Sequence, residues 1–172
     1  MKKHILIILT LGLFYSGIAQ TLDTVSVGAG YANEVWYSLD DDSETHHARS
    51  DWDLAFSVGG RGAAIHTNGG NGVELRVYQG GDTSAWASVD TVGISSWPIL
   101  YNTDTSWAVG AFNSKAAGGF DYGWGNYSLI THFVTADSLY VLKLANGSYK
   151  KLWLDKLASG VYYFKHADLN GE

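Results

Sequence analysis

The alternation of apolar and polar residues in the run Asp-Trp-Asp-Leu-Ala-Phe, residues 51–56, predicts an extended strand with one buried face. Trp52, Leu54 and Phe56 recur at every second position. Successive side chains of a strand point to opposite faces, so these three share one face and the two aspartates share the other. We therefore expect the apolar side chains to pack on a core and the aspartates to face away from it.

Similar short runs, separated by Gly, Asn, Asp and Ser, recur along a chain that holds 21 glycines and one proline. This pattern is typical of an all-β domain, here an antiparallel fold with long irregular loops and at most one short helix. That helix is expected at Asp82–Val89, capped by Asp82 or Thr83. Asn146-Gly147 predicts a hairpin tip, because both residues tolerate the positive φ of a type I′ turn. The expected strands are Glu34–Leu39, Asp51–Ser57, Ala63–Thr67, Val73–Tyr78, Ile130–Thr135, Leu139–Ala145, Tyr149–Leu157 and Gly160–His166.

The first 19 residues predict a secretory signal peptide. Two lysines follow Met1, residues 5–15 are apolar, and the triplet Gly-Ile-Ala at 17–19 places small residues before a cleavage site. We expect cleavage after Ala19, which leaves Gln20 first on a protein that is secreted or held at the cell surface. No second apolar stretch approaches the roughly 20 residues of a membrane-spanning helix, so a retained anchor is the disfavoured alternative.

The composition bears on how the domain is stabilised and on which partners it can bind. The chain has no cysteine, so a hydrophobic core must stabilise it without disulfides, and about 150 residues suffice for a single domain over residues 20–172. Its single methionine, Met1, leaves with the signal peptide. The remaining residues hold 9 Lys and Arg against 17 Asp and Glu, a net charge of −8. Such a surface repels phosphate backbones, so nucleic acid is not an expected partner.

No catalytic motif is visible in the sequence: G-x-S-x-G, a Cys-His pair and H-E-x-x-H are all absent. Asp51 and Asp53 share a strand face, where carboxylates commonly bind backbone amides. A glycosidase needs two carboxylates roughly 5–10 Å apart across a cleft. The run Asp-Asp-Asp-Ser-Glu at 40–44 predicts an acidic turn, because a calcium loop needs further oxygen ligands at set spacing. We therefore expect a binding protein rather than an enzyme.

Three segments are similar in sequence to one known family. They are Ser50–Gly70, with SDWDLAF and TNGG; Phe120–Tyr127, with a central Gly-Trp element; and Leu139–Leu154, with YVLKLANGSYKKLWL. Together they resemble the HmuY family, the haem-binding domain of secreted Bacteroidetes proteins, over roughly residues 21–168. The resemblance implies a HmuY-like β fold that binds haem or a related porphyrin for iron acquisition. Longer family members continue into a sorting region, so the alternative is that residues 20–172 are the N-terminal part of a longer product.

The resemblance also implies where haem would be held. In that family two axial side chains, His or Met, bind the iron from loops at one end of the β structure. His132 lies nearest the Gly-Trp element, three residues after the position that matches one family ligand. The other family position falls within residues 97–120, which hold no histidine. The second ligand is therefore expected from His66, from Tyr101 or from the His-His pair at 46–47. We predict His132 as the metal ligand, with His66 and Tyr101 also binding the cofactor.

Both histidines have a structural alternative. His132 shares strand parity with Ile130 and Val134, which fits a core histidine bonded to a neighbour. His66 lies beside the Asn-Gly-Gly turn at 68–70, which fits a solvated or turn-bonding role.

The seven tryptophans support a second functional hypothesis. Exposed aromatic side chains on a β scaffold stack on sugar rings, so a non-haem HmuY-like cell-surface or glycan-binding module is the alternative to haem binding. Large aromatics also fill the core of a disulfide-free domain, a role that fits Trp36, Trp52 and Trp153. The glycan hypothesis depends on the exposure of the three tryptophans outside clear strands: Trp86, Trp97 and Trp107.

Overall fold

The computed structural model describes residues 21–57 and 63–171, which form ten strands and five 3₁₀ helices. All strand pairs are antiparallel, so the prediction of an all-β fold is confirmed. The predicted signal peptide and its cleavage site lie outside the described residues. Within those residues, no helix has the length and apolar character needed to cross a membrane.

The elements occur along the chain in the following order. The strands are β1 (Asn33–Ser38), β2 (Ser43–Ala48), β3 (Leu54–Phe56), β4 (Ile65–Thr67), β5 (Glu74–Val77), β6 (Gly125–Tyr127), β7 (Val134–Ala136), β8 (Leu139–Lys143), β9 (Tyr149–Ala158) and β10 (Val161–Asp168). The 3₁₀ helices are η1 (Ala29–Tyr31), η2 (Gly69–Asn71), η3 (Thr83–Ser88), η4 (Ile94–Ser96) and η5 (Ala111–Asn113).

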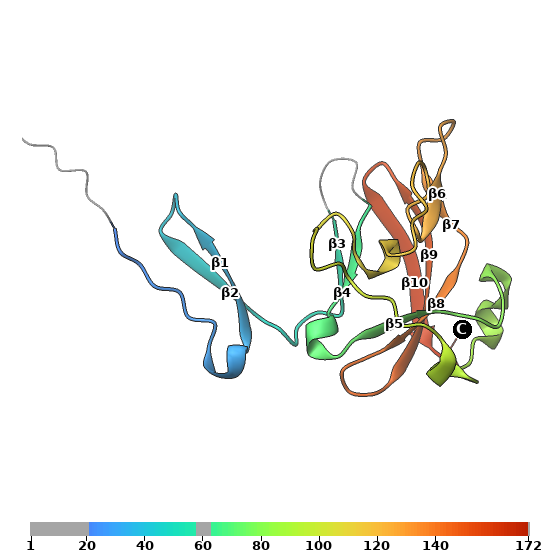
Figure 1. Cartoon of the computed structure of the whole chain (residues 1–172), viewed down its shortest axis with the longest axis horizontal. Helices are drawn as coiled ribbons and strands as arrows, with labels where there is room; N and C mark the ends of the chain where they lie inside the picture. Colours follow the sequence, from blue (N-terminus) through green and yellow to red (C-terminus); the bar gives the residue numbers. More distant parts are fainter. Residues whose placement is uncertain (1–20, 58–62, 172) are drawn as a thin grey trace, which may run out of the picture.

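The long strand β9 is the centre of a six-stranded sheet (Figure 1). On one side, its first half pairs with β8 and its second half with β7; on the other side it pairs with β10. β5 pairs with β8, and β6 pairs with β7. The sheet therefore runs from an edge made of β5 and β6, through β7 with β8 and then β9, to β10 at the opposite edge.

Both faces of this sheet are covered by apolar side chains. On one face, alternate residues of β5, β8 and β9 pack against β4, η5 and Trp124. On the other face, Leu139 and Val141 pack against the segment that carries η3 and η4. This double cover explains why β8 reads as an uninterrupted apolar run instead of an alternating one. The buried residues of the first face include Ile65, Leu75, Phe112, Trp124, Tyr140, Leu142, Leu152 and Leu154.

The predicted face of residues 51–56 is confirmed. Trp52, Leu54 and Phe56 are half-buried, whereas the three residues that alternate with them are exposed. The strand itself is shorter than predicted, since only β3 pairs, with β4. Before β3, the carbonyl oxygen of Trp52 accepts from Asn68 Nδ2 at 2.8 Å, and that of Asp53 accepts from the backbone N of Asn68 at 2.9 Å. This backbone therefore bonds to one residue after β4 instead of to a strand.

The predicted hairpin at Asn146-Gly147 is confirmed between β8 and β9, but its turn differs from the expected type I′. Only Gly147 has a positive φ, of 83°, and its backbone N donates to the carbonyl oxygen of Leu144 at 2.8 Å. This is the geometry of a longer turn that ends in a left-handed glycine. The positive φ at two central residues that a type I′ turn requires occurs in the next hairpin, at Ser159 (51°) and Gly160 (79°).

The predicted helix at 82–89 is confirmed as η3, of the 3₁₀ type. The Asp82 carboxylate caps it by accepting from the backbone N of Ser84 at 2.9 Å. The other four 3₁₀ helices are single turns of three residues.

The predicted strand Ile130–Thr135 is wrong in its first half. Ser128 Oγ accepts from the backbone N of Ile130 at 3.3 Å and of Thr131 at 3.2 Å. His132 follows with a φ of 59°. These local bonds close a turn, so pairing starts only at β7.

Two strands, β1 and β2, form a hairpin that extends away from the six-stranded sheet (Figure 1). The turn between them spans residues 39–42, so the predicted acidic turn at 40–44 is confirmed in its first three residues, and Ser43 and Glu44 already pair within β2. None of the hairpin's residues is buried. β2 was not predicted because its sequence, Ser-Glu-Thr-His-His-Ala, has no apolar alternation.

Candidate functional site

The loop that follows Asn102 is fixed at its base by the side chain of that residue. Asn102 Oδ1 accepts from the backbone N of Thr67 at 3.1 Å and of Ala111 at 2.9 Å, and its Nδ2 donates to the carbonyl oxygen of Thr67 at 2.7 Å. The backbone N of Thr103 also donates to the carbonyl oxygen of Val109 at 3.2 Å and closes the loop on itself. These bonds tie both ends of the loop to β4 and η5.

Gly110 lets the loop return close to β4. A Cβ atom at this position would lie 2.1 Å from the carbonyl oxygen of Ile65, a distance that no side chain can adopt. Glycine is therefore required by the close approach of two backbones. Because its base is held against β4, the loop presents its tip at a defined place on the surface.

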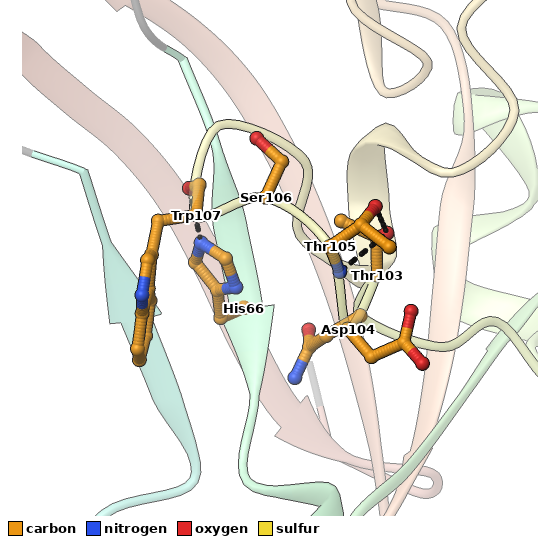
Figure 2. A pocket seen from close by; sticks show the side chains of 7 residues that line it. His66, Thr103, Asp104, Thr105, Ser106 and Trp107 are labelled. Carbon is orange, nitrogen blue, oxygen red and sulfur yellow. Dashed lines mark hydrogen bonds between the residues drawn. The ribbon is translucent and has the colours of Figure 1, made fainter.

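Trp107 lies at this tip with 88% of its surface exposed. Its carbonyl oxygen accepts from His66 Nε2 at 3.0 Å, and the two ring centroids lie 5.8 Å apart (Figure 2). A carbonyl oxygen can only accept, so Nε2 carries the proton and the neutral His66 ring has its lone pair on Nδ1. The contact with His66 orders the backbone of Trp107 and leaves its indole accessible.

A pocket of about 330 Å³ lies between His66 and this loop. Figure 2 shows His66 between the indole of Trp107 and a group of polar side chains from the loop. The hydroxyl oxygens of Thr103 and Thr105 lie 2.9 Å apart, and Asp104 adds a carboxylate. The lining has no Lys or Arg, so it suits an uncharged ligand that carries hydroxyl groups. Its residues are His66, Asn102, Thr103, Asp104, Thr105, Ser106 and Trp107.

The three predicted haem-binding residues do not all line the pocket. Of the three, only His66 lines the pocket. Tyr101 is exposed beside the loop base. His132 is exposed in the turn before β7, where its Nδ1 lies 2.7 Å from the hydroxyl oxygen of Tyr127. The alternative of a core position for His132 is therefore wrong, because the turn at Ser128 takes this residue out of the strand.

The Gly-Trp element lies in the core. Trp124 is fully buried, and its Nε1 donates to the carbonyl oxygen of Ala63 at 2.8 Å. The buried side chain of Asn113 donates to the same oxygen at 3.1 Å and to the carbonyl oxygen of Tyr122 at 2.9 Å. This network joins distant segments beneath the sheet, so the element has a structural role.

The indole rings of the other two tryptophans named by the glycan hypothesis are not freely accessible. Trp97 is 8% exposed and belongs to the core. Trp86 is half-buried and covered by lysines: Lys165 Nζ lies 4.2 Å from its ring centroid, and Lys151 Nζ lies 4.7 Å from it. Of these three candidates, Trp107 alone has the exposure that stacking on a ligand requires.

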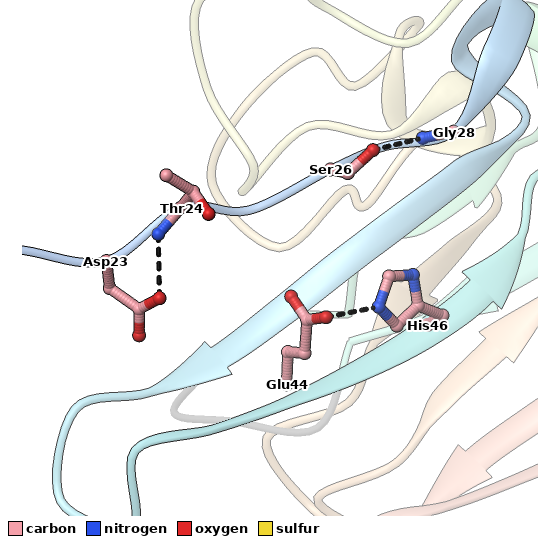
Figure 3. A network of polar contacts seen from close by, with 6 residues as sticks. All are labelled: Asp23, Thr24, Ser26, Gly28, Glu44 and His46. Carbon is pink, nitrogen blue, oxygen red and sulfur yellow. Dashed lines mark hydrogen bonds and ion pairs between the residues drawn. The ribbon is translucent and has the colours of Figure 1, made fainter.

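The carboxylates of the acidic hairpin serve local hydrogen bonds. The Tyr37 hydroxyl donates to Asp23 and to Asp42, and these bonds raise the pKa of the Tyr37 phenol. Glu44 lies 2.9 Å from His46 Nε2 (Figure 3). Among residues 21–57 and 63–171, no group of three or more His, Cys, Asp or Glu side chains could hold a metal ion.

Most of the pocket was missed from the sequence. Asn102, Thr103, Asp104, Thr105 and Ser106 were not among the predicted site residues. The available signal was a run of side chains able to form hydrogen bonds directly before a tryptophan that lies outside any strand.

No family model, curated protein or solved structure matches the chain. The resemblance to the HmuY family therefore stays a prediction.

Proposed function

We propose that the chain is a glycan-binding module whose site is the pocket beside Trp107. The observation that carries the proposal is the exposed indole at the tip of a loop with a fixed base, which lines one pocket with His66 and with hydroxyl and carboxylate groups. An indole face is apolar and polarisable, and it packs against the C–H face of a pyranose ring. The neighbouring hydroxyl, amide and carboxylate groups can exchange hydrogen bonds with the hydroxyls of the sugar.

The charge of the lining favours neutral sugars over acidic ones. The pocket contains the Asp104 carboxylate and no Lys or Arg. A uronic acid or sulfated sugar would place a second negative charge beside that carboxylate without a compensating cation, which disfavours binding.

The test compares three variants on a panel of neutral oligosaccharides: cellohexaose, laminarihexaose, mannohexaose and galactohexaose. Binding is measured by isothermal titration calorimetry. A central aromatic anchor contributes about 2 kcal/mol, so Trp107→Ala should weaken binding by roughly 30-fold. Trp107→Phe should retain part of the affinity, because it keeps an aromatic face.

The matched control is Trp36→Ala, which removes an indole that is 68% exposed on β1 and lies outside the pocket. It should bind like the wild type. The proposal is wrong if no sugar of the panel binds, or if Trp107→Ala and Trp36→Ala have equal effects.

Haem binding is the second candidate, and the geometry of His66 is the observation that favours it. Its Nε2 donates to a backbone carbonyl, the arrangement commonly found when the other ring nitrogen binds a metal. The pocket supplies one imidazole and no second His, Tyr or Met. His132 and Tyr101 do not line this pocket, so a second axial ligand from either of them stays a prediction.

Titration of haemin tests this candidate. A Soret shift in the wild type that His66→Ala removes and His132→Ala preserves would support single ligation at His66. Loss of the shift in His132→Ala would instead support the ligand that the family resemblance predicts. No shift in the wild type would reject haem binding.

A further inference from the structure

The six-stranded sheet has one covered edge and one open edge. At the covered edge, the backbone N of Leu100 donates to the carbonyl oxygen of Leu75, and that of Tyr127 donates to the carbonyl oxygen of Phe120, both at 2.8 Å. At the other edge, β10 pairs with β9 alone among the described residues. The register of β10 shifts between Tyr163 and Phe164, and on each side of this bulge alternate residues direct backbone N–H and C=O groups outward, an arrangement that accepts a further strand.

The open edge also carries large exposed apolar residues. Val161, Tyr163 and Phe164 are each about half exposed. A shallow hollow of about 440 Å³ lies beside them, lined by Trp153, Asp155 and residues 162–165. The ring of Phe164 also stacks on that of Phe56 at a centroid distance of 5.3 Å, so part of this apolar surface already contacts β3. The exposed remainder on an unpaired edge favours contact with another protein surface.

The β1–β2 hairpin lacks a surface on which to pack. No residue of either strand is buried, and Trp36 contacts the ring of His47 at a centroid distance of 6.1 Å. A lone two-stranded hairpin is marginally stable in water. Packing on a further strand would give the hairpin the third partner that such structures need.

The charges of the two elements are complementary. Residues 33–48, the hairpin, hold five Asp and Glu and no Lys or Arg. Residues 149–168, which form β9 and β10, hold four Lys and two Asp. Lys151 is buried and Lys150 pairs with Asp168 at 2.8 Å, so Lys156 and Lys165 are the lysines that remain for the hairpin. Opposite charges on two surfaces steer their association and fix their register.

The hairpin is held away from the β10 edge of its own copy. Asn68, which is buried, donates from Nδ2 to the carbonyl oxygens of Arg49 at 2.5 Å and of Trp52 at 2.8 Å. Arg49 also donates to the carbonyl oxygen of Gly70 at 3.3 Å. These bonds fix the segment that leaves the hairpin, so the hairpin extends outward (Figure 1). A hairpin that adds to β10 would then come from another molecule.

We propose that the chain self-assembles by adding the acidic β1–β2 hairpin of one copy to the free β10 edge of a second copy. The occupant of the edge is this hairpin, which supplies backbone groups to β10 and carboxylates to Lys156 of the neighbouring strand. Reciprocal exchange closes the contact as a dimer, and one-way exchange propagates it.

The test measures two quantities on the whole protein: the mass of the particle in solution and the hydrogen exchange of the β10 amides. Sedimentation velocity from 1 to 100 µM should show a mass that rises with concentration. Hydrogen exchange of the β10 amides should slow by at least tenfold over the same range. A monomer with fast exchange at all concentrations would overturn the proposal. A monomer whose β10 amides are slow throughout would overturn it too, because its own hairpin would then cover the edge.

Charge exchange provides the control. Lys156→Glu on β9 and the double variant Asp40→Lys with Asp41→Lys on the hairpin should each weaken association by at least tenfold. Mixing the two variants should restore it, since opposite charges meet again. Lys115→Glu makes the same charge change at an exposed site outside both elements and should associate like the wild type. Equal behaviour of Lys156→Glu and Lys115→Glu, or no recovery on mixing, would refute the proposed contact.

Discussion

Replacing Asn102 by Ala should destabilise the protein through the base of the Trp107 loop. The substitution removes three hydrogen bonds, of 2.7, 2.9 and 3.1 Å, with the backbone of Thr67 and Ala111. Both partner residues are buried, so water does not freely replace the lost side chain. At about 1 kcal/mol for each bond, the expected loss in the free energy of unfolding is about 3 kcal/mol. That is a large share of the 5–15 kcal/mol typical of a whole domain.

The measurement is urea-induced unfolding followed by circular dichroism, with the slope m expected to remain unchanged. The matched control is Asn126→Ala, which removes an exposed amide whose Nδ2 lies 3.5 Å from the carboxylate of Asp137. It should change the free energy by less than about 0.5 kcal/mol. Asn102→Asp keeps both acceptor bonds and loses the donor, so it should lie between Asn102→Ala and the wild type. Equal losses in Asn102→Ala and Asn126→Ala would refute the reasoning.

Two further predictions concern packing and pH. Gly110→Ala places a Cβ 2.1 Å from the carbonyl oxygen of Ile65, so thermal unfolding should show a loss of about 1–3 kcal/mol; an unchanged Tm would contradict the close approach. Hydrogen bonding to Arg76, assisted by Lys143, holds the pKa of Glu74 below its ordinary value of 4.5. The stability from this carboxylate is therefore present above pH 4.5 and lost as the pH falls through the lower folded pKa. Arg76→Met should reduce the fall in the free energy of unfolding at acid pH, measured from unfolding curves taken at successive pH values. An unchanged fall would argue against the pairing.

The features that the sequence predicted correctly depend on neighbours along the chain. Strand parity placed Trp52, Leu54 and Phe56 on the face that packs inward. Turn chemistry located the hairpin at Asn146-Gly147, and a capping carboxylate located η3. Each rule involves residues within a few positions of one another, so a single sequence suffices to apply it.

The features that the sequence missed depend on distant residues or on competing local bonds. The pocket exists because Asn102 bonds to Thr67, 35 positions earlier, and no periodicity records such a contact. The first half of the strand predicted at 130–135 was lost to a turn that Ser128 closes. The polar strand β2 pairs with β1, although its sequence has no apolar pattern that would predict a strand.

The central position of β9 has a consequence for the order of folding. β9 joins β8 through residues 144–148 and joins β10 through Ser159-Gly160 alone, whereas β5 reaches β8 across a separation of 69 positions between Glu74 and Lys143. The entropy lost on closing a loop grows with its length, so this C-terminal meander closes at the lowest cost. It would serve as the nucleus on which the earlier strands and the Trp107 loop dock. Changes at Ser159-Gly160 would then alter the folding rate, whereas changes in the late-docking loop would act mainly on the rate of unfolding.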